Sequence, residues 1–144
     1  MKKFLILIST ISLLGCSTLQ PYIQNDATIT TAVSVLTLSG LKYAVKDSAK
    51  RTVISDYIMV YAPALRTITG NPTASELTLQ INAFIPTNIR SDYPELIALV
   101  IPAVTSTYQS AYAKYGGNTK ELYRVLSDIA TGLENGAAPY ATRK

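Results

Sequence analysis

Nine carboxylates, ten tyrosines and one cysteine are the side chains that could do chemistry in this chain of 144 residues, which contains no histidine. Without histidine, acid–base catalysis near neutral pH would depend on carboxylates. Two carboxylates could cleave a glycosidic bond, but no pair is singled out by its spacing. Three glutamates instead have a structural explanation, because each lies three residues after a residue that can cap a helix. The pairs are Thr73 and Glu76, Asp92 and Glu95, and Asn118 and Glu121. We therefore expect a protein that is not an enzyme and that has no metal site and no cofactor.

The tyrosines are unusual because the chain has only two phenylalanines and no tryptophan. Five of them are spaced three or four residues apart, about one helical turn, within two groups. The first group is Tyr57 and Tyr61, and the second is Tyr108, Tyr112 and Tyr115. Tyrosines commonly border a core with their hydroxyl groups in water. They are also enriched at protein interfaces. The sequence favours the first role and leaves the second, a partner-binding face, open.

The single cysteine, Cys16, ends an apolar run. Lys2 and Lys3 precede the mainly apolar residues 4–14, and Gly15 lies directly before the cysteine. A positive start followed by a short apolar run is typical of a secretory signal peptide. The run is shorter than the roughly 20 apolar residues that a membrane-spanning helix needs.

The residues Leu13-Leu14-Gly15-Cys16 resemble the lipobox of bacterial lipoproteins. The resemblance implies that a diacylglyceryl group is attached to Cys16, that the chain is cleaved between Gly15 and Cys16, and that the new amino terminus is acylated, for example with palmitate. Two or more acyl chains anchor a protein stably, since each buried methylene contributes about 0.8 kcal/mol. The alternative is an ordinary cleaved signal peptide, with Cys16 as a buried thiol.

The residue after the cysteine, Ser17, bears on the location. In many Gram-negative bacteria, lipoproteins without aspartate at this position are carried to the outer membrane. The resemblance therefore implies an outer-membrane lipoprotein that faces the periplasm, with a Gram-positive cell surface as the alternative.

The charges exclude a nucleic-acid partner. The formal net charge is +4, and loss of Lys2 and Lys3 with the signal peptide leaves 11 basic and 9 acidic side chains. The one local basic group, Lys46, Lys50 and Arg51, is interrupted by an aspartate. Nucleic-acid binding needs a basic patch or stripe.

The mature chain is long enough for one domain with its own core. Residues 1–15 are interpreted as the signal peptide, 16–26 as the lipidated amino terminus and a tether, 27–136 as a helical domain, and 137–144 as a flexible tail. The spacing of apolar residues predicts an all-α bundle of four or five helices.

The helix boundaries follow from capping and helix-breaking residues. Helices are expected over 27–45, from Asp47 or Ser48 with a break near Pro63, from Thr73 to Pro86, from Asp92 to Gly116, and from Asn118 onward. Residues Val33 to Leu38 could also form a strand, because β-branched residues are frequent there. Residues Leu96 to Val104 are expected to be the most buried segment, residues 88–91 a loop, and Gly132 and Gly136 the frayed end of the last helix.

Two functions from different classes remain. The first is a lipid-anchored envelope protein that acts without catalysis, as a binding or structural accessory module in contact with another envelope protein or with murein. The alternative is a small envelope enzyme that acts on murein through carboxylates. A homo-oligomer is left open by the sequence.

Overall fold

The computed structural model describes residues 26–142, which form an all-α bundle. This part of the chain contains six α-helices and one 3₁₀ helix and no β-strand. In chain order they are α2 (Asp26–Ala44), α3 (Ser48–Tyr61), η2 (Ala62–Thr67), α4 (Ala74–Phe84), α5 (Thr87–Asp92), α6 (Pro94–Tyr115) and α7 (Thr119–Ala137). The all-α prediction is confirmed. The helices outnumber the four or five expected, because residues 87–92 form a short helix instead of a loop. The signal peptide, Cys16 and nearly all of the predicted tether lie outside the described residues.

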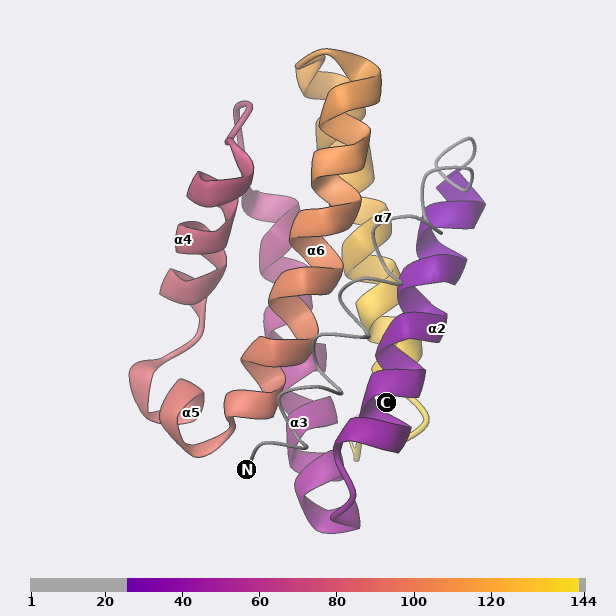
Figure 1. Ribbon diagram of the computed structural model, residues 1–144, viewed down its shortest axis with the longest axis vertical. Coiled ribbons are helices and arrows are strands. Elements are labelled where there is room, and N and C mark those ends of the chain that lie inside the picture. The colour runs from indigo at the N-terminus through magenta and orange to yellow at the C-terminus, as the bar shows by residue number, and fades with distance from the viewer. Residues whose placement is uncertain (1–25, 143–144) are drawn as a thin grey trace, which may run out of the picture.

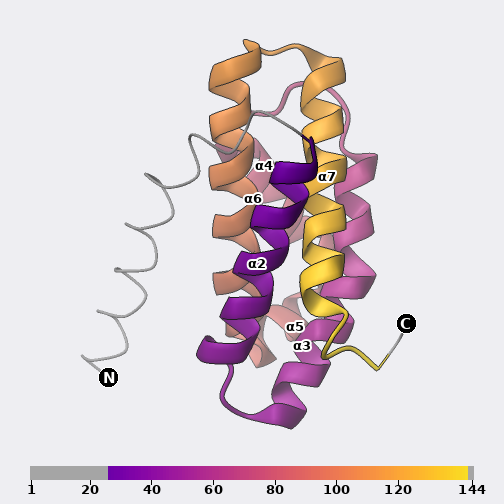
Figure 2. The ribbon, with the colours of Figure 1, turned by 90° about the vertical axis from the view of Figure 1, so that its right-hand side faces the viewer.

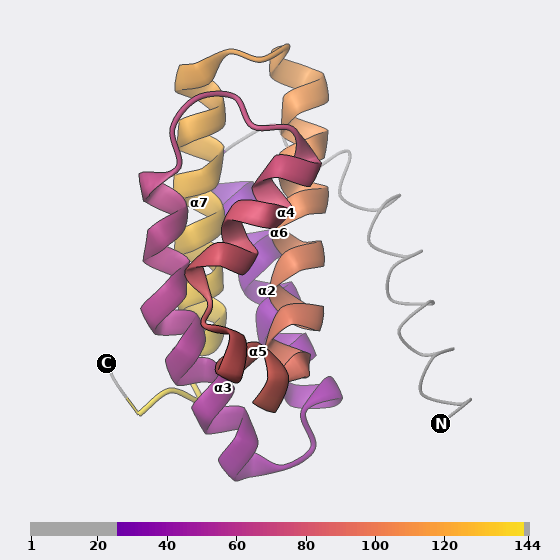
Figure 3. The ribbon, with the colours of Figure 1, turned by 90° about the vertical axis from the view of Figure 1, so that its left-hand side faces the viewer.

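The helices α6 and α7 form the centre of the bundle (Figure 1). They run antiparallel and pack against each other, and between them they contact every other described element. The most extensive contact is that of α2 with α7, and these two helices run in the same direction (Figure 2). On the other side of the bundle lie α3, α4 and α5 (Figure 3). We call the end with the turn at Gly116 the α6–α7 end, and the opposite end, with the turn at 45–47, the α2–α3 end.

The first helix, α2, is helical throughout, so the strand alternative for Val33 to Leu38 is wrong. Every fourth residue from Ile29 onward is buried, ending at Val45. The buried Thr37 belongs to this stripe because its hydroxyl donates to the carbonyl oxygen of Val33 (2.8 Å).

Gly132 and Gly136 do not fray α7, contrary to expectation. The helix continues to Ala137, and both glycines are buried against α2. A Cβ atom on Gly132 would lie 2.7 Å from the Cβ of Val33, and one on Gly136 would lie 2.6 Å from the carbonyl oxygen of Ser34. The glycines therefore allow the backbones of α2 and α7 to approach closely.

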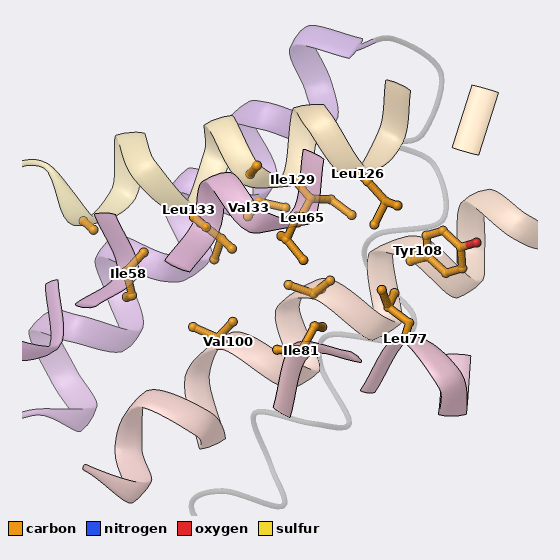
Figure 4. Close-up of a cluster of buried hydrophobic side chains, with 14 of the residues drawn as sticks. Val33, Ile58, Leu65, Leu77, Ile81, Val100, Tyr108, Leu126, Ile129 and Leu133 are labelled. Carbon is orange, nitrogen blue, oxygen red and sulfur yellow. The ribbon is translucent and has the colours of Figure 1, made fainter. Parts of the chain in front are cut away.

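The most buried segment lies in α7 and not at Leu96 to Val104, so that prediction is wrong. Of residues 96–104, Leu96, Val100, Ala103 and Val104 are buried and the others are partly or fully exposed. In α7 the buried positions are Leu122, Val125, Leu126, Ile129, Ala130, Gly132, Leu133, Gly136 and Ala137. The difference arises because α7 is covered by α2, η2, α3 and α6. Figure 4 shows Leu126, Ile129 and Leu133 of α7 within this core.

Local capping signals set several helix ends as predicted. The capping box of Thr73 and Glu76 is present at α4, and Asn118 accepts hydrogen bonds from the backbone amides of Lys120 and Glu121. At α3, Asp47 accepts from the amide of Lys50 (2.9 Å). These contacts satisfy amides that the first helical turn leaves without partners.

Two helix ends differ in detail from the prediction. The expected break near Pro63 is confirmed, since α3 ends at Tyr61 and η2 follows it. The expected start of α6 at Asp92 is wrong, because Asp92 ends α5 and Tyr93 precedes α6 without a side-chain cap. Tyr93, with φ −128° and ψ 64°, lies outside the helical region, which is disfavoured for a residue before proline.

Residues that follow α7 lie against α3. The carboxylate of Asp56 accepts hydrogen bonds from the amide (2.7 Å) and the hydroxyl (2.6 Å) of Thr142. The guanidinium of Arg51 lies 5.1 Å from the centre of the Tyr140 ring and donates to carbonyl oxygens at the end of α2, including that of Val45 (2.7 Å). This part of the predicted tail therefore has defined contacts with α3.

Candidate functional site

The five tyrosines considered as a partner face lie in two separate places. Tyr57 and Tyr61 are on α3, whereas Tyr108, Tyr112 and Tyr115 are on the last turns of α6. Tyr57 contacts Tyr93 at the start of α6, with ring centres 5.4 Å apart. Tyr108 lies fifteen residues farther along the chain, which is about 22 Å along a helix. The five tyrosines therefore do not form one continuous surface.

Tyr108 is a core residue with no exposed surface. Its ring lies beside Leu77 at one end of the core, with the hydroxyl directed away from the other labelled side chains (Figure 4). Within residues 26–142 no group forms a hydrogen bond with this hydroxyl. Burial raises the pKa of Tyr108, and nearby Tyr112 and Glu76 raise it further. The favoured interpretation, a ring that borders the core with its hydroxyl in water, therefore holds for the packing of the Tyr108 ring but not for its hydroxyl, which is buried.

Tyr112 and Tyr115 lie near the α6–α7 end. Tyr112 is 39% exposed, and its ring centre is 6.2 Å from that of Tyr108. Tyr115 is half-buried, with the Nζ atom of Lys114 5.0 Å from its ring centre. These two rings border the core and reach the surface.

Tyr57, Tyr61, Tyr93 and Phe84 form what we call the aromatic patch. The rings of Tyr57 and Tyr61 are stacked with centres 6.2 Å apart, and Tyr93 meets Tyr57 edge-on. All four side chains are partly buried and pack against the core. The patch thus joins α3, the end of α4 and the junction of α5 with α6 (Figure 3).

A small apolar pocket lies beside Tyr61 and Phe84. Its other lining residues are Ile58, Ala62, Leu65, Ile81, Ile85, Leu96, Val100 and Leu133, all of which are buried. Tyr61 and Phe84 are the most exposed of the lining side chains, so we call these two rings the mouth of the pocket. Its volume is about 20 Å³, far below the roughly 300 Å³ or more of small-molecule sites. The pocket could take the tip of an apolar side chain but not a metabolite.

One ion pair borders the aromatic patch. The Nζ atom of Lys50 lies 2.7 Å from Oε1 of Glu95 and 6.0 Å from the ring centre of Tyr93. Burial alone would raise the pKa of Glu95, but the hydrogen bond and charge of Lys50, with a backbone hydrogen bond, outweigh it and lower this pKa. Glu95 therefore pairs with α3 and does not have the capping role expected from the sequence.

Phe84 and Tyr93 belong to the patch but were not among the predicted site residues. Phe84 is partly exposed because it lies at the edge of the pocket. Tyr93 lacks a helical spacing to the other tyrosines. The signal that could have found it is its position before Pro94, where the chain changes direction between two helices.

Residues 26–142 contain no group of three or more carboxylate, cysteine or histidine side chains that could hold a metal ion. None of the helices in this range is both long and apolar enough to span a bilayer. Comparisons of the chain with protein-family models, with curated proteins and with solved structures find no match.

Proposed function

We propose that this protein is a lipid-anchored envelope protein that acts without catalysis and holds a protein partner against its aromatic patch. The anchor is Cys16, which carries lipid and becomes the acylated amino terminus after cleavage between Gly15 and Cys16. The location is the periplasmic face of the outer membrane. The signal-peptide and lipobox residues support lipid attachment at Cys16. Ser17 supports the outer membrane as the location. The partner is another protein of the cell envelope.

The observation that carries the binding role is the aromatic patch with its pocket. Rigid aromatic side chains around a small apolar depression are typical of the centres of protein interfaces. A pocket of this size can take the terminal methyl group of an apolar side chain of a partner protein.

The carboxylates support a role without catalysis. Among the described carboxylates, those with partners within the fold include Asp47, Asp56, Glu76, Glu95, Glu121 and Glu134. The pair of Glu134 with Arg66 has two contacts, of 2.7 and 2.8 Å, and joins η2 to α7. Carboxylates held in this way stabilise the bundle.

Photo-cross-linking in intact cells tests the binding role. A benzoylphenylalanine placed at Tyr61 lies at the mouth of the pocket, and one placed at Tyr43, which is 69% exposed on α2, is the matched control. We expect a discrete protein adduct from position 61 and none from position 43. Equal adducts from both positions, no adduct from position 61, or a ladder of murein fragments would contradict the proposal.

A further inference from the structure

The position of α2 relates the predicted lipid anchor to one end of the bundle. The hydroxyl of Thr30 donates to the carbonyl oxygen of Asp128 (3.3 Å), which fixes the level of α2 along α7. Asp26 lies four residues before Thr30, about 6 Å, and Thr119 lies nine residues before Asp128, about 14 Å. The start of α7 therefore lies only about 8 Å beyond the start of α2 along the bundle. The two helices run in the same direction (Figure 2).

The opposite end is much farther from the start of α2. Asp26 and Ala44 are eighteen residues apart, about 27 Å along the helix, and the turn at 45–47 lies beyond. Ten residues separate Cys16 from Asp26, and they can span at most about 33 Å when fully extended. If the α2–α3 end were on the membrane, the segment from Cys16 to Asp26 would need almost its full extended length to reach from the membrane to the start of α2. If the α6–α7 end is on the membrane, the same segment needs only a small part of its extended length.

The α6–α7 end also has side chains that suit a lipid surface. Tyr112 and Tyr123 are 39% and 49% exposed, and Lys114 and Lys120 are exposed near them. Tyrosine rings favour the headgroup region, where one side is apolar and the other wet. Lysine ammonium groups are attracted to anionic headgroups.

The other charged groups near this end have both signs, and Glu76 at the start of α4 adds a carboxylate near Tyr108. Arg124 pairs with Glu121 at 2.8 Å, and the tip of the turn, residues 116–119, is uncharged. The α2–α3 end also carries exposed side chains of these types, Lys42, Tyr43 and Lys46. The types of exposed side chain therefore do not show which end faces the membrane. The start of α2 favours the α6–α7 end, because it lies much closer to that end.

We propose that the α6–α7 end of the bundle rests on the bilayer surface, with Tyr112, Tyr123, Lys114 and Lys120 at the lipid headgroups. This inference depends on the proposed anchor at Cys16. The aromatic patch then lies on the side of the bundle, open to a partner in the periplasm.

Fluorescence quenching in vesicles tests this orientation. The full lipidated protein is prepared with Lys120→Cys or, as the matched control, Lys46→Cys, since both lysines are exposed and lie at opposite ends. Each new thiol is labelled with nitrobenzoxadiazole, and the protein is placed in phosphatidylethanolamine and phosphatidylglycerol vesicles that contain a spin-labelled phospholipid. We expect several-fold stronger quenching at position 120 than at position 46.

The outcomes separate the two proposals. A protein that floats with the vesicles but is quenched equally at both positions, or more strongly at position 46, overturns the orientation alone. A protein that does not float with the vesicles overturns the anchor and the orientation together. Circular dichroism of both variants checks that the helices are intact.

Discussion

The buried hydroxyl of Tyr108 is an energetic cost to the fold. A buried polar group without a partner costs about 1–3 kcal/mol, and no described residue forms a hydrogen bond with this one. We expect Tyr108→Phe to raise the free energy of unfolding by about 1 kcal/mol, since it removes this group and keeps the ring. Tyr123→Phe, at an exposed position, should change little. Denaturant unfolding of both variants is the measurement, and a less stable Tyr108→Phe would contradict this prediction.

The capping carboxylate of Glu76 links stability to pH. Hydrogen bonds from the backbone amide and the hydroxyl of Thr73 lower the pKa of Glu76 below its ordinary value of 4.5. A lowered pKa in the folded state means that the stabilisation is fully present above pH 4.5 and is lost as the pH falls through the folded value. We expect stability to fall less steeply in acid for Glu76→Gln than for the unchanged protein. Unfolding curves from pH 7 to pH 3 test this, and parallel pH profiles would contradict it.

Side chains whose partners lie close in sequence were predicted well, and those with distant partners were not. Thr73 and Glu76 are three residues apart, so their capping box follows from spacing. Glu95 also had a capping pattern, but its partner is Lys50, 45 residues away. No local pattern contains that contact, because it depends on how α3 packs beside α6.

At the scale of the elements, the contact between α2 and α7 depends on glycine. Replacement of glycine by alanine within a helix gains up to about 1 kcal/mol, but overpacking costs about 1–3 kcal/mol. At Gly136 the new Cβ would lie 2.6 Å from the backbone carbonyl oxygen of Ser34, which cannot move without α2. We therefore expect Gly136→Ala to lower the free energy of unfolding by about 1–2 kcal/mol.

Two variants serve as controls for this prediction. Asn135→Ala, at an exposed position one residue earlier, should not destabilise. Gly40→Ala should be milder than Gly136→Ala, because its Cβ would meet the end of the flexible Leu99 side chain and not a backbone atom. Thermal unfolding compares all three, and a Gly136→Ala variant as stable as Asn135→Ala would show that the close approach of the helices is not needed.

Helix type and most helix ends could be predicted from the sequence, but the depth of burial could not. Capping residues, Pro63 and Gly116 act within one or two turns, so their effects are readable locally. Gly132 and Gly136 have the same local signature as a frayed helix end. Their role in packing appears only when α2, about 100 residues earlier in the chain, lies against them.

At the scale of the whole molecule, the aromatic patch is a product of the tertiary fold. Its rings come from α3, α4 and the junction before α6, and Tyr93 belongs to it through a contact with Tyr57 across 36 residues of sequence. The periodicity of tyrosines in the sequence predicted two of its members, Tyr57 and Tyr61, and grouped them with Tyr108, which is in the core. The spacing of tyrosines in the sequence therefore does not predict which of their rings share a surface, because that depends on the tertiary fold.

The proposed lipid anchor at Cys16 underlies both the location and the orientation of the bundle, and Cys16→Ser tests it. The measurement is the membrane-bound fraction of the full-length protein in cells, compared between the unchanged chain and Cys16→Ser. We expect the unchanged protein to be membrane-bound and the variant to be released, because acyl chains attached at Cys16 supply the anchoring energy. An unchanged membrane-bound fraction in Cys16→Ser would contradict the lipid anchor and, with it, the orientation proposed for the bundle.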